Sequence, residues 1–256
     1  MNNAVFGKTM ENVRNRIDYE LVTNPDRVTA LAKRPRYKAS NIFNDKLVGI
    51  EMLKSKVVLN KPIGIGFSIL DLSKVLMYDF HYNTMKKTYE DKCRLLFTDT
   101  DSLTYEVTTD DLYKDMETIK EQFDFSDYDK SHFLYDKTNQ KVIGKFKDEA
   151  NGEPIIEFVG LKAKMYSYLT EDECIKKAKG VKTNVVKKTI THDDYKQCLF
   201  DDKFTKFAQM KTIQSKNHQL YSVTQNKIAL TGYDDKRWYE NAFKSYAYGH
   251  YETKQV

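Results

Sequence analysis

The clearest periodic pattern along the chain lies in residues 61–90. Apolar residues there recur at spacings of three and four, the period of an α-helix with one buried face. These positions are Ile65, Ile69, Leu72, Leu76 and Phe80. We therefore expect a core helix from about residue 62 to residue 90. A weaker pattern of the same kind predicts a second helix over residues 4–17.

Short β-prone runs separate and follow these helices. Residues 19–22 and 46–53 predict strands, and Asn24-Pro25 between them favours a helix start. Residues 94–107 predict two strands joined by a tight polar turn. A helix with an acidic first turn is expected over residues 109–123.

The second half of the chain continues this alternation of strands and helices. Residues 141–169 predict two or three antiparallel strands that turn at Asn151-Gly152. Thr191 followed by Asp194 has the spacing of a capping box, which favours a helix over residues 191–200. Eight lysines fall within residues 162–188, which suggests a domain boundary near residue 160. This lysine run suits either a solvated face or a grip on duplex phosphates.

Composition narrows the class of protein. The 256 residues include 18 Tyr and 14 Phe, enough apolar material for a folded core and against disorder. Net charge is +5, a mild excess that suits a polyanionic partner without requiring one. Three widely spaced cysteines favour a reducing compartment over a disulfide scaffold or a zinc site. With neither a membrane-spanning run nor a signal peptide, we expect a soluble, intracellular protein.

Asp99 and Asp101 stand in the predicted turn of the hairpin at residues 94–107. Two carboxylates this close cannot both stay ionised in a low-dielectric site unless a cation neutralises them, and Mg²⁺ is commonly held by one or two carboxylates plus phosphates. Residues two apart on a strand share a face, so both side chains would face one ligand and Thr100 would point away. An acidic surface turn without a ligand is also ordinary. An EF-hand is excluded, because Leu103 occupies the third ligand position.

Three motifs in this sequence stand in the order found in family B DNA polymerases. "FTDTDS", residues 97–102, resembles the palm motif Y-x-D-T-D-S, with Phe97 in place of tyrosine. "NNAVFG", residues 2–7, resembles the end of the fingers-helix motif K-x-x-x-N-S-x-Y-G, and "KMY", residues 164–166, matches the K-x-Y motif. Residues 61–83, 95–106 and 158–168 are similar to the protein-primed polymerases of Polinton or Maverick transposons and related DNA viruses. This resemblance covers essentially the whole chain.

The resemblance implies a fold and a division of the chain. It implies an α+β fold with an antiparallel palm sheet backed by helices and a mixed, basic thumb. Residues 1–17 would end the fingers helix, residues 18–160 would form the palm and residues 161–256 the thumb. For a mobile element of a eukaryote, the intracellular location would be the nucleus.

The resemblance also implies site residues and partners. Asp101 and Asp99 would be the catalytic carboxylates that hold Mg²⁺, with two ions in the complete enzyme. Around the incoming nucleotide the motifs would place Asn3, Phe6 and Gly7. On the DNA primer strand they would place Lys162, Lys164 and Tyr166. The partners would be a DNA primer-template, dNTPs and a terminal priming protein.

One part of the family pattern is missing from this sequence. The palm motif D-x-x-S-L-Y-P-S, which supplies a further aspartate, does not occur in it. We therefore expect the C-terminal part of a longer DNA polymerase, with little or no activity of its own. Two other hypotheses stay open. The chain would be a non-catalytic DNA-binding remnant of a decayed polymerase, or the hairpin would be a structural metal site unrelated to nucleic acid.

Overall fold

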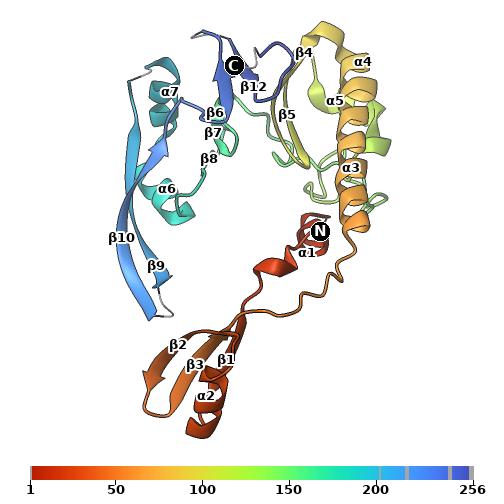
Figure 1. The fold of residues 1–256 in the computed structure, drawn as a ribbon. Coiled ribbons are helices and arrows are strands. Elements are labelled where there is room, and N and C mark those ends of the chain that lie inside the picture. The colour runs from red at the N-terminus through yellow and green to blue at the C-terminus, as the bar shows by residue number, and fades with distance from the viewer. Residues whose placement is uncertain (1, 202, 217–218, 242–243, 254–256) are drawn as a thin grey trace. The chain divides into compact units, whose positions relative to one another are not determined.

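The computed structural model describes residues 2–201, 203–216, 219–241 and 244–253 (Figure 1). The fold is mixed α and β, and its strand pairings are antiparallel wherever the register is defined. The chain forms two compact units. Residues 1–78 with 213–222 make up the first unit, and residues 79–212 with 223–256 make up the second. The expected boundary at residue 160 lies inside strand β6 (Glu157–Lys162), while the assignment to fingers, palm and thumb stays a prediction.

The first unit contains a small three-stranded sheet and three α-helices. Its elements are α1 (Asn2–Thr9), the 3₁₀ turn Val13–Asn15, β1 (Asp18–Val22), α2 (Pro25–Ala32), β2 (Tyr37–Asn44), β3 (Leu47–Met52) and α3 (Ile63–Asp79). The strand order is β1-β3-β2, and α2 packs on one face over Val22, Ile50 and Met52. The predicted helix start is confirmed, because the Asn24 side chain accepts hydrogen bonds from the first turn of α2.

The predicted helix over residues 4–17 is wrong beyond Thr9, where α1 ends. The Asn12 side chain accepts a hydrogen bond from the Arg14 N–H and caps the short 3₁₀ turn instead. Asparagine competes with the helix for backbone donors in this way, so the apolar spacing alone did not locate the helix end.

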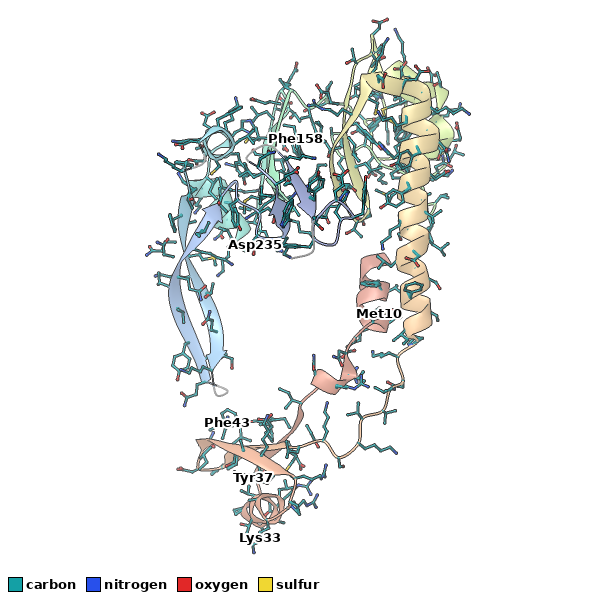
Figure 2. The ribbon with its side chains drawn as sticks, turned by 45° about the horizontal axis from the view of Figure 1, so that its top comes forward. Met10, Lys33, Tyr37, Phe43, Phe158 and Asp235 are labelled. Carbon is teal, nitrogen blue, oxygen red and sulfur yellow. The ribbon has the colours of Figure 1, made fainter. Side chains whose placement is uncertain are left out.

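The long helix is confirmed, but its predicted buried face is covered only in part, because Phe80 is buried and Ile69 is half-buried. After α3 the helical path continues through the π-helical turn Phe80–Met85 and α4 (Lys86–Tyr89). Ile65 is 57% exposed and Leu72 is 68% exposed, whereas Gly66 is buried. A Cβ on Gly66 would lie 2.8 Å from Cγ of Met10, which is labelled in Figure 2. The close approach to the end of α1 therefore decides which face of α3 is covered, and it selects a glycine.

The second unit holds the remaining elements. They are the 3₁₀ turn Glu90–Lys92, β4 (Cys93–Asp99), β5 (Ser102–Val107), α5 (Leu112–Thr118), the 3₁₀ turn Lys120–Gln122, β6, β7 (Met165–Leu169), β8 (Cys174–Ala178), α6 (Thr183–Thr189), α7 (His192–Phe200), β9 (Lys206–Lys216), β10 (Gln219–Leu230), β11 (Arg237–Tyr239) and β12 (Ser245–Ala247). Strands pair as β4-β5, β6-β7-β8, β9-β10 and β11-β12. Residues 213–222 of β9 and β10 belong to the first unit.

Two apolar cores support these sheets. Leu103, Tyr105 and Val107 of β5 pack against a cluster that includes Phe80 and Met116. The sheet β6-β7-β8 packs one face against α6 and α7 through a second cluster. Its members are Val159, Met165, Ala178, Val186, Ile190, Tyr195, Cys198, Ala208, Ala229 and Leu230. The predicted capping box is confirmed, since Thr191 and Asp194 exchange hydrogen bonds at the start of α7.

The strands expected within residues 141–156 are not formed. Asn151 and Gly152 do make a turn, with φ of 52° and 93°. However, the Asp148 carboxylate organises it by accepting hydrogen bonds from the N–H groups of Ala150 and Gly152. A side chain can thus hold a turn that flanking strands would otherwise hold. The hairpin turn that does follow lies between β6 and β7, at Ala163-Lys164.

Candidate functional site

The predicted hairpin at residues 94–107 is confirmed, and the two aspartates lie at its tip. Asp99 pairs with Ser102, which leaves Thr100-Asp101 as a two-residue turn. The Asp101 N–H donates to the Asp99 carbonyl oxygen at 2.6 Å. The expectation that both carboxylates share a strand face is wrong, because β4 ends at Asp99 and Asp101 belongs to the turn. The tight turn itself, rather than the pleat, brings these residues together.

Backbone conformation at this tip is costly. Thr100 has a φ of 56°, in the left-handed region that a β-branched residue rarely adopts. Such a conformation costs roughly 1–2 kcal/mol for an L-residue. Strained residues of this kind persist only where their surroundings fix them, and they cluster at functional sites. The strain is a property of this hairpin independent of any motif comparison.

A second hairpin tip lies beside the first. Lys162 pairs with Met165 between β6 and β7, and Lys164 in the turn has a φ of 60°. Nζ of Lys164 lies 3.5 Å from Oδ2 of Asp99. The K-x-Y and D-T-D segments are therefore in direct contact. Lys164 lies in the turn that precedes β7, whereas Tyr166 lies within β7.

Four aromatic rings continue this contact between the two hairpins. Phe97 of β4 packs on Tyr166 of β7 with ring centroids 4.6 Å apart. Phe158 of β6 stacks on Tyr166 at 5.9 Å, and Tyr168 follows at 6.4 Å. We call Phe97, Phe158, Tyr166 and Tyr168 the aromatic cluster. Phe158 and Tyr168 were not predicted. Tyr166 and Tyr168 alternate along β7, which is visible in the sequence, and Phe158 pairs with Tyr168 across β6 and β7.

Carboxylates shape the electrostatics of this surface. Burial, followed by the charges of Glu149 and Asp99, raises the pKa of Tyr166 above its ordinary value of 10. Burial and then Glu149 raise the pKa of Tyr168 in the same way. Both phenols therefore stay protonated at neutral pH and can donate hydrogen bonds. Glu149, like Phe158, was missed by sequence reasoning, because its position depends on the Asp148-held turn.

The donor set at the tip fits a hard divalent cation. Asp101 is exposed and the Asp99 side chain is 34% exposed, so solvent reaches both residues. Mg²⁺ accepts such oxygens and completes its shell with water and phosphate oxygens. Within the part of the chain that the structure describes, no group of three or more His, Cys, Asp or Glu is arranged to hold a metal.

Lysines of the predicted basic thumb have structural partners. Lys162 Nζ donates to the Tyr233 carbonyl at 2.7 Å. Lys176 Nζ donates to the Ile190 carbonyl at 2.6 Å, and Lys182 Nζ donates to the Lys211 carbonyl. Part of the lysine run thus ties loops and helix ends to the sheet. A DNA contact by Lys162 stays a prediction, and it would compete with this hydrogen bond.

The residues predicted to border a nucleotide belong to the first unit. Phe6 and Gly7 lie in α1, and the side chain of Asn3 lies outside the described residues. A Cβ on Gly7 would meet no heavy atom within 4 Å. Nothing within the described chain therefore requires glycine at this position, and its predicted role in leaving room for a nucleotide remains a prediction.

Comparison with protein-family models, with curated proteins and with solved structures finds no match for this chain. Among the helices described, none is both long and apolar enough to span a membrane. What the chain does must therefore be inferred from its own residues. The contact that joins Asp99, Lys164, Phe97 and Tyr166 is the strongest of the observations available for that inference.

Proposed function

We propose that this chain is the palm and thumb part of a protein-primed family B DNA polymerase, a nucleotidyltransferase that extends a primer on a DNA template. The observation that carries the proposal is the contact between two motifs far apart in the sequence. Asp99 lies 3.5 Å from Lys164, and Phe97 packs on Tyr166. Motif resemblance selected these residues without any structural information, and neither motif by itself requires the other to be near.

Each residue of the contact suits one task in nucleotidyl transfer. Asp101 and Asp99 supply carboxylate oxygens for Mg²⁺, which when bound lowers the pKa of a primer hydroxyl and neutralises phosphate charge. Lys164 offers a cation to the primer-strand phosphates, and the Tyr166 ring offers a flat surface to a sugar. Its raised pKa keeps the phenol a hydrogen-bond donor. Phe97 lacks a hydroxyl, so its contribution is packing.

A complete active site requires more than this hairpin. One pair of carboxylates cannot surround two metal ions, and the D-x-x-S-L-Y-P-S motif is missing from the sequence. The proposal therefore needs a further aspartate from another polypeptide segment. DNA primer-template, dNTPs and a terminal priming protein are the partners it implies. By itself the chain would have little or no polymerase activity.

A second candidate function is a non-catalytic DNA-binding remnant of such a polymerase. The observation in its favour is that the described residues offer no group of three metal-ligating side chains. A remnant would keep the basic surfaces that bind phosphates. Its carboxylates would no longer need to be arranged around a metal ion. The two candidates differ in whether Asp101 is needed for any measurable property.

Primer extension with Mg²⁺ or Mn²⁺ separates the two. We expect slow, template-directed incorporation that Asp101→Asn lowers at least about a hundredfold, since even outer-shell partners of a metal cost ten- to a hundredfold. Asp110→Asn, an exposed aspartate just beyond β5, is the matched control and should change nothing.

DNA binding by fluorescence anisotropy completes the test. Binding that survives Asp101→Asn, with no incorporation by any variant, would support the remnant. Incorporation that is insensitive to Asp101→Asn, or a chain that binds no DNA under any condition, would contradict the proposal.

A further inference from the structure

Two connectors in the first unit carry an excess of positive charge. Residues 10–17 link α1 to β1, and residues 53–62 link β3 to α3 (Figure 1). They touch where Lys54 Nζ donates to the Val13 carbonyl oxygen at 3.3 Å. Their charged residues number five basic and one acidic. These are Arg14, Arg16, Lys54, Lys56 and Lys61 against Glu11. The connectors therefore account for most of the net charge of +5 that the whole chain carries.

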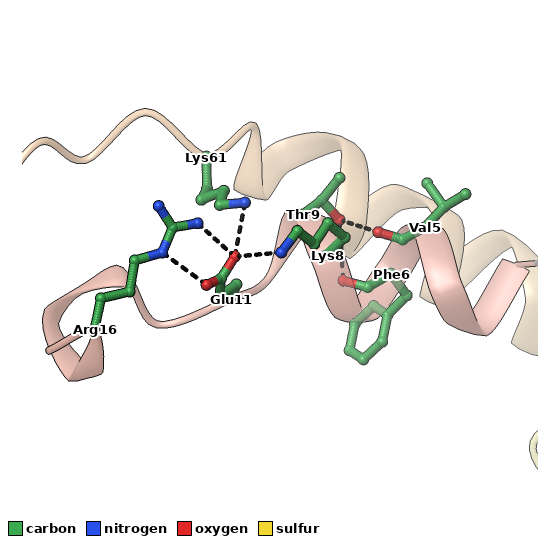
Figure 3. A network of polar contacts seen from close by, with 7 residues as sticks. All are labelled: Val5, Phe6, Lys8, Thr9, Glu11, Arg16 and Lys61. Carbon is green, nitrogen blue, oxygen red and sulfur yellow. Dashed lines mark hydrogen bonds and ion pairs between the residues drawn. The ribbon is translucent and has the colours of Figure 1, made fainter. Parts of the chain in front are cut away.

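The single carboxylate of the connectors is already saturated (Figure 3). Arg16 binds Glu11 with two hydrogen bonds of 2.8 Å, and Lys61 Nζ lies 2.8 Å from the same carboxylate. Lys8 of α1 adds a third cation at 3.2 Å. Arg16 above all, then Lys61 and Lys8, holds the pKa of Glu11 far below its ordinary 4.5. This carboxylate therefore fixes the connectors in place without neutralising them.

A hollow opens between the connectors. Its polar lining comes from Arg16, Lys54, Lys56 and Asn60, and its remaining lining from valines at residues 13, 57 and 58. No acidic side chain lines it. The volume is about 160 Å³. A cavity needs only about 10–15 Å³ of such volume to hold one water molecule, so the hollow is large enough for a phosphate group.

We propose that this hollow binds a backbone phosphate of a nucleic-acid strand. Three cations and an amide converge on it, and two of the cations are pre-oriented. Glu11 holds Arg16, while the Val13 carbonyl holds Lys54. Pre-orientation lowers the entropy lost on binding. The valines offer apolar contact to the sugar beside a phosphate. The choice of nucleic acid over other polyanions rests on the proposed function, whereas the hollow is separate from the carboxylate site and needs no metal.

Oligonucleotide binding in EDTA tests this proposal, because EDTA silences any divalent site. The variant is Lys54→Gln/Lys56→Gln, and the control is Lys33→Gln/Lys46→Gln, two exposed lysines of the same unit. We expect the variant to weaken binding at least about tenfold. Loss of one phosphate contact lowers the slope of log affinity against log salt by about 0.7–0.9, which is the change expected for the double variant. The control should stay within about twofold.

Lys56→Gln alone guards against a folding defect, since no hydrogen bond or ion pair is recorded for the Lys56 side chain among the described residues. It should lower the salt slope by half as much as the double variant. An unchanged affinity and slope in both variants would overturn the proposal. Loss of pyrophosphate binding without loss of DNA binding in the double variant would also overturn it, because the ligand would then be a free phosphate. Asp101→Asn should bind like the parent here, which keeps this test distinct from the test of the carboxylate site.

Discussion

Asp99 and Glu11 both pair with lysine, yet their surroundings have opposite balances of charge. Asp99 shares a two-residue turn with Asp101 and lies 3.5 Å from Lys164. Glu11 lies within 3.2 Å of three cations, contributed by Lys8, Arg16 and Lys61. The first region places two carboxylates in one turn, which suits a cation. The second gathers three cations around one carboxylate, which suits an anion.

Backbone strain separates the same two regions. Thr100 and Lys164, at the two hairpin tips, both have left-handed φ angles. Within connector residues 10–17 and 53–62, all of which are described, no residue has a positive φ. The hairpin tips hold their charged groups by strained turns, whereas the connectors hold theirs by side-chain hydrogen bonds to a carboxylate and to a backbone carbonyl. Changes at the tips should therefore alter stability more than changes at the connectors.

Thr100→Gly tests the strain and has the largest expected effect on stability. Relief of the left-handed conformation is worth roughly 1–2 kcal/mol, and the greater freedom of glycine in the unfolded chain offsets roughly 0.5–1 kcal/mol of it. We expect the free energy of unfolding in urea to rise by up to about 1 kcal/mol. Asn151→Gly is the control, because asparagine tolerates its φ of 52° and should gain less. A loss of stability in Thr100→Gly would show that the turn is not strained.

Lys164→Gln tests the balance of charge around Asp99 at the hairpin tip. In the absence of a metal, the ammonium of Lys164 competes for the Asp99 carboxylate, so its removal should strengthen divalent binding. An ion pair this exposed is worth about 0.2–1 kcal/mol, which corresponds to about a 1.4- to fivefold gain in Mn²⁺ affinity. Mn²⁺ titration by electron paramagnetic resonance measures it. Lys179→Gln, an exposed lysine beyond β8, should leave the affinity unchanged.

A weaker Mn²⁺ affinity in Lys164→Gln would contradict this account of the ion pair. It would indicate that Lys164 positions the turn for the metal instead of competing with it. The stability of each variant in urea separates a loss of folding from a loss of binding.

Glu11→Gln has the smallest expected effect, because the Glu11 network is exposed to solvent and salt. The pKa of Glu11 is lowered in the folded chain, so its contribution to stability is present above about pH 4.5 and is lost as the pH falls below that value. Hydrogen exchange of residues 10–17 should accelerate between pH 6 and pH 3.5 in the parent, after correction for intrinsic rates. Glu11→Gln should remove this pH dependence, and an equal dependence in the variant would refute the role of Glu11.

Local patterns were sufficient for the elements that position the site. The β4-β5 hairpin, the long helix, the Asn24 cap and the Thr191 capping box follow from residue types within a few positions of each other. Family resemblance then selected Asp99, Asp101, Lys164 and Tyr166. The sequence showed the candidates, but their contact depends on how two hairpins pack.

Features that depend on long-range packing escaped prediction. Met10 approaches α3 at Gly66, so the apolar spacing located only part of the covered face. Strand β2 carries few apolar side chains and shows no clear alternation. The turn in which Glu149 lies is held by side-chain hydrogen bonds of Asp148, and the charge of Glu149 acts on Tyr166.

The most direct test of the central claim is a Mn²⁺ titration of the isotopically labelled chain, followed by paramagnetic broadening of its backbone amide resonances. The account predicts that residues 99–102 and 163–165 broaden first, and that Asp101→Asn abolishes this while Asp110→Asn does not. Earliest broadening at any other segment, or at the hairpin tip with equal strength in Asp101→Asn, would contradict the assignment of Asp99 and Asp101 as a cation site.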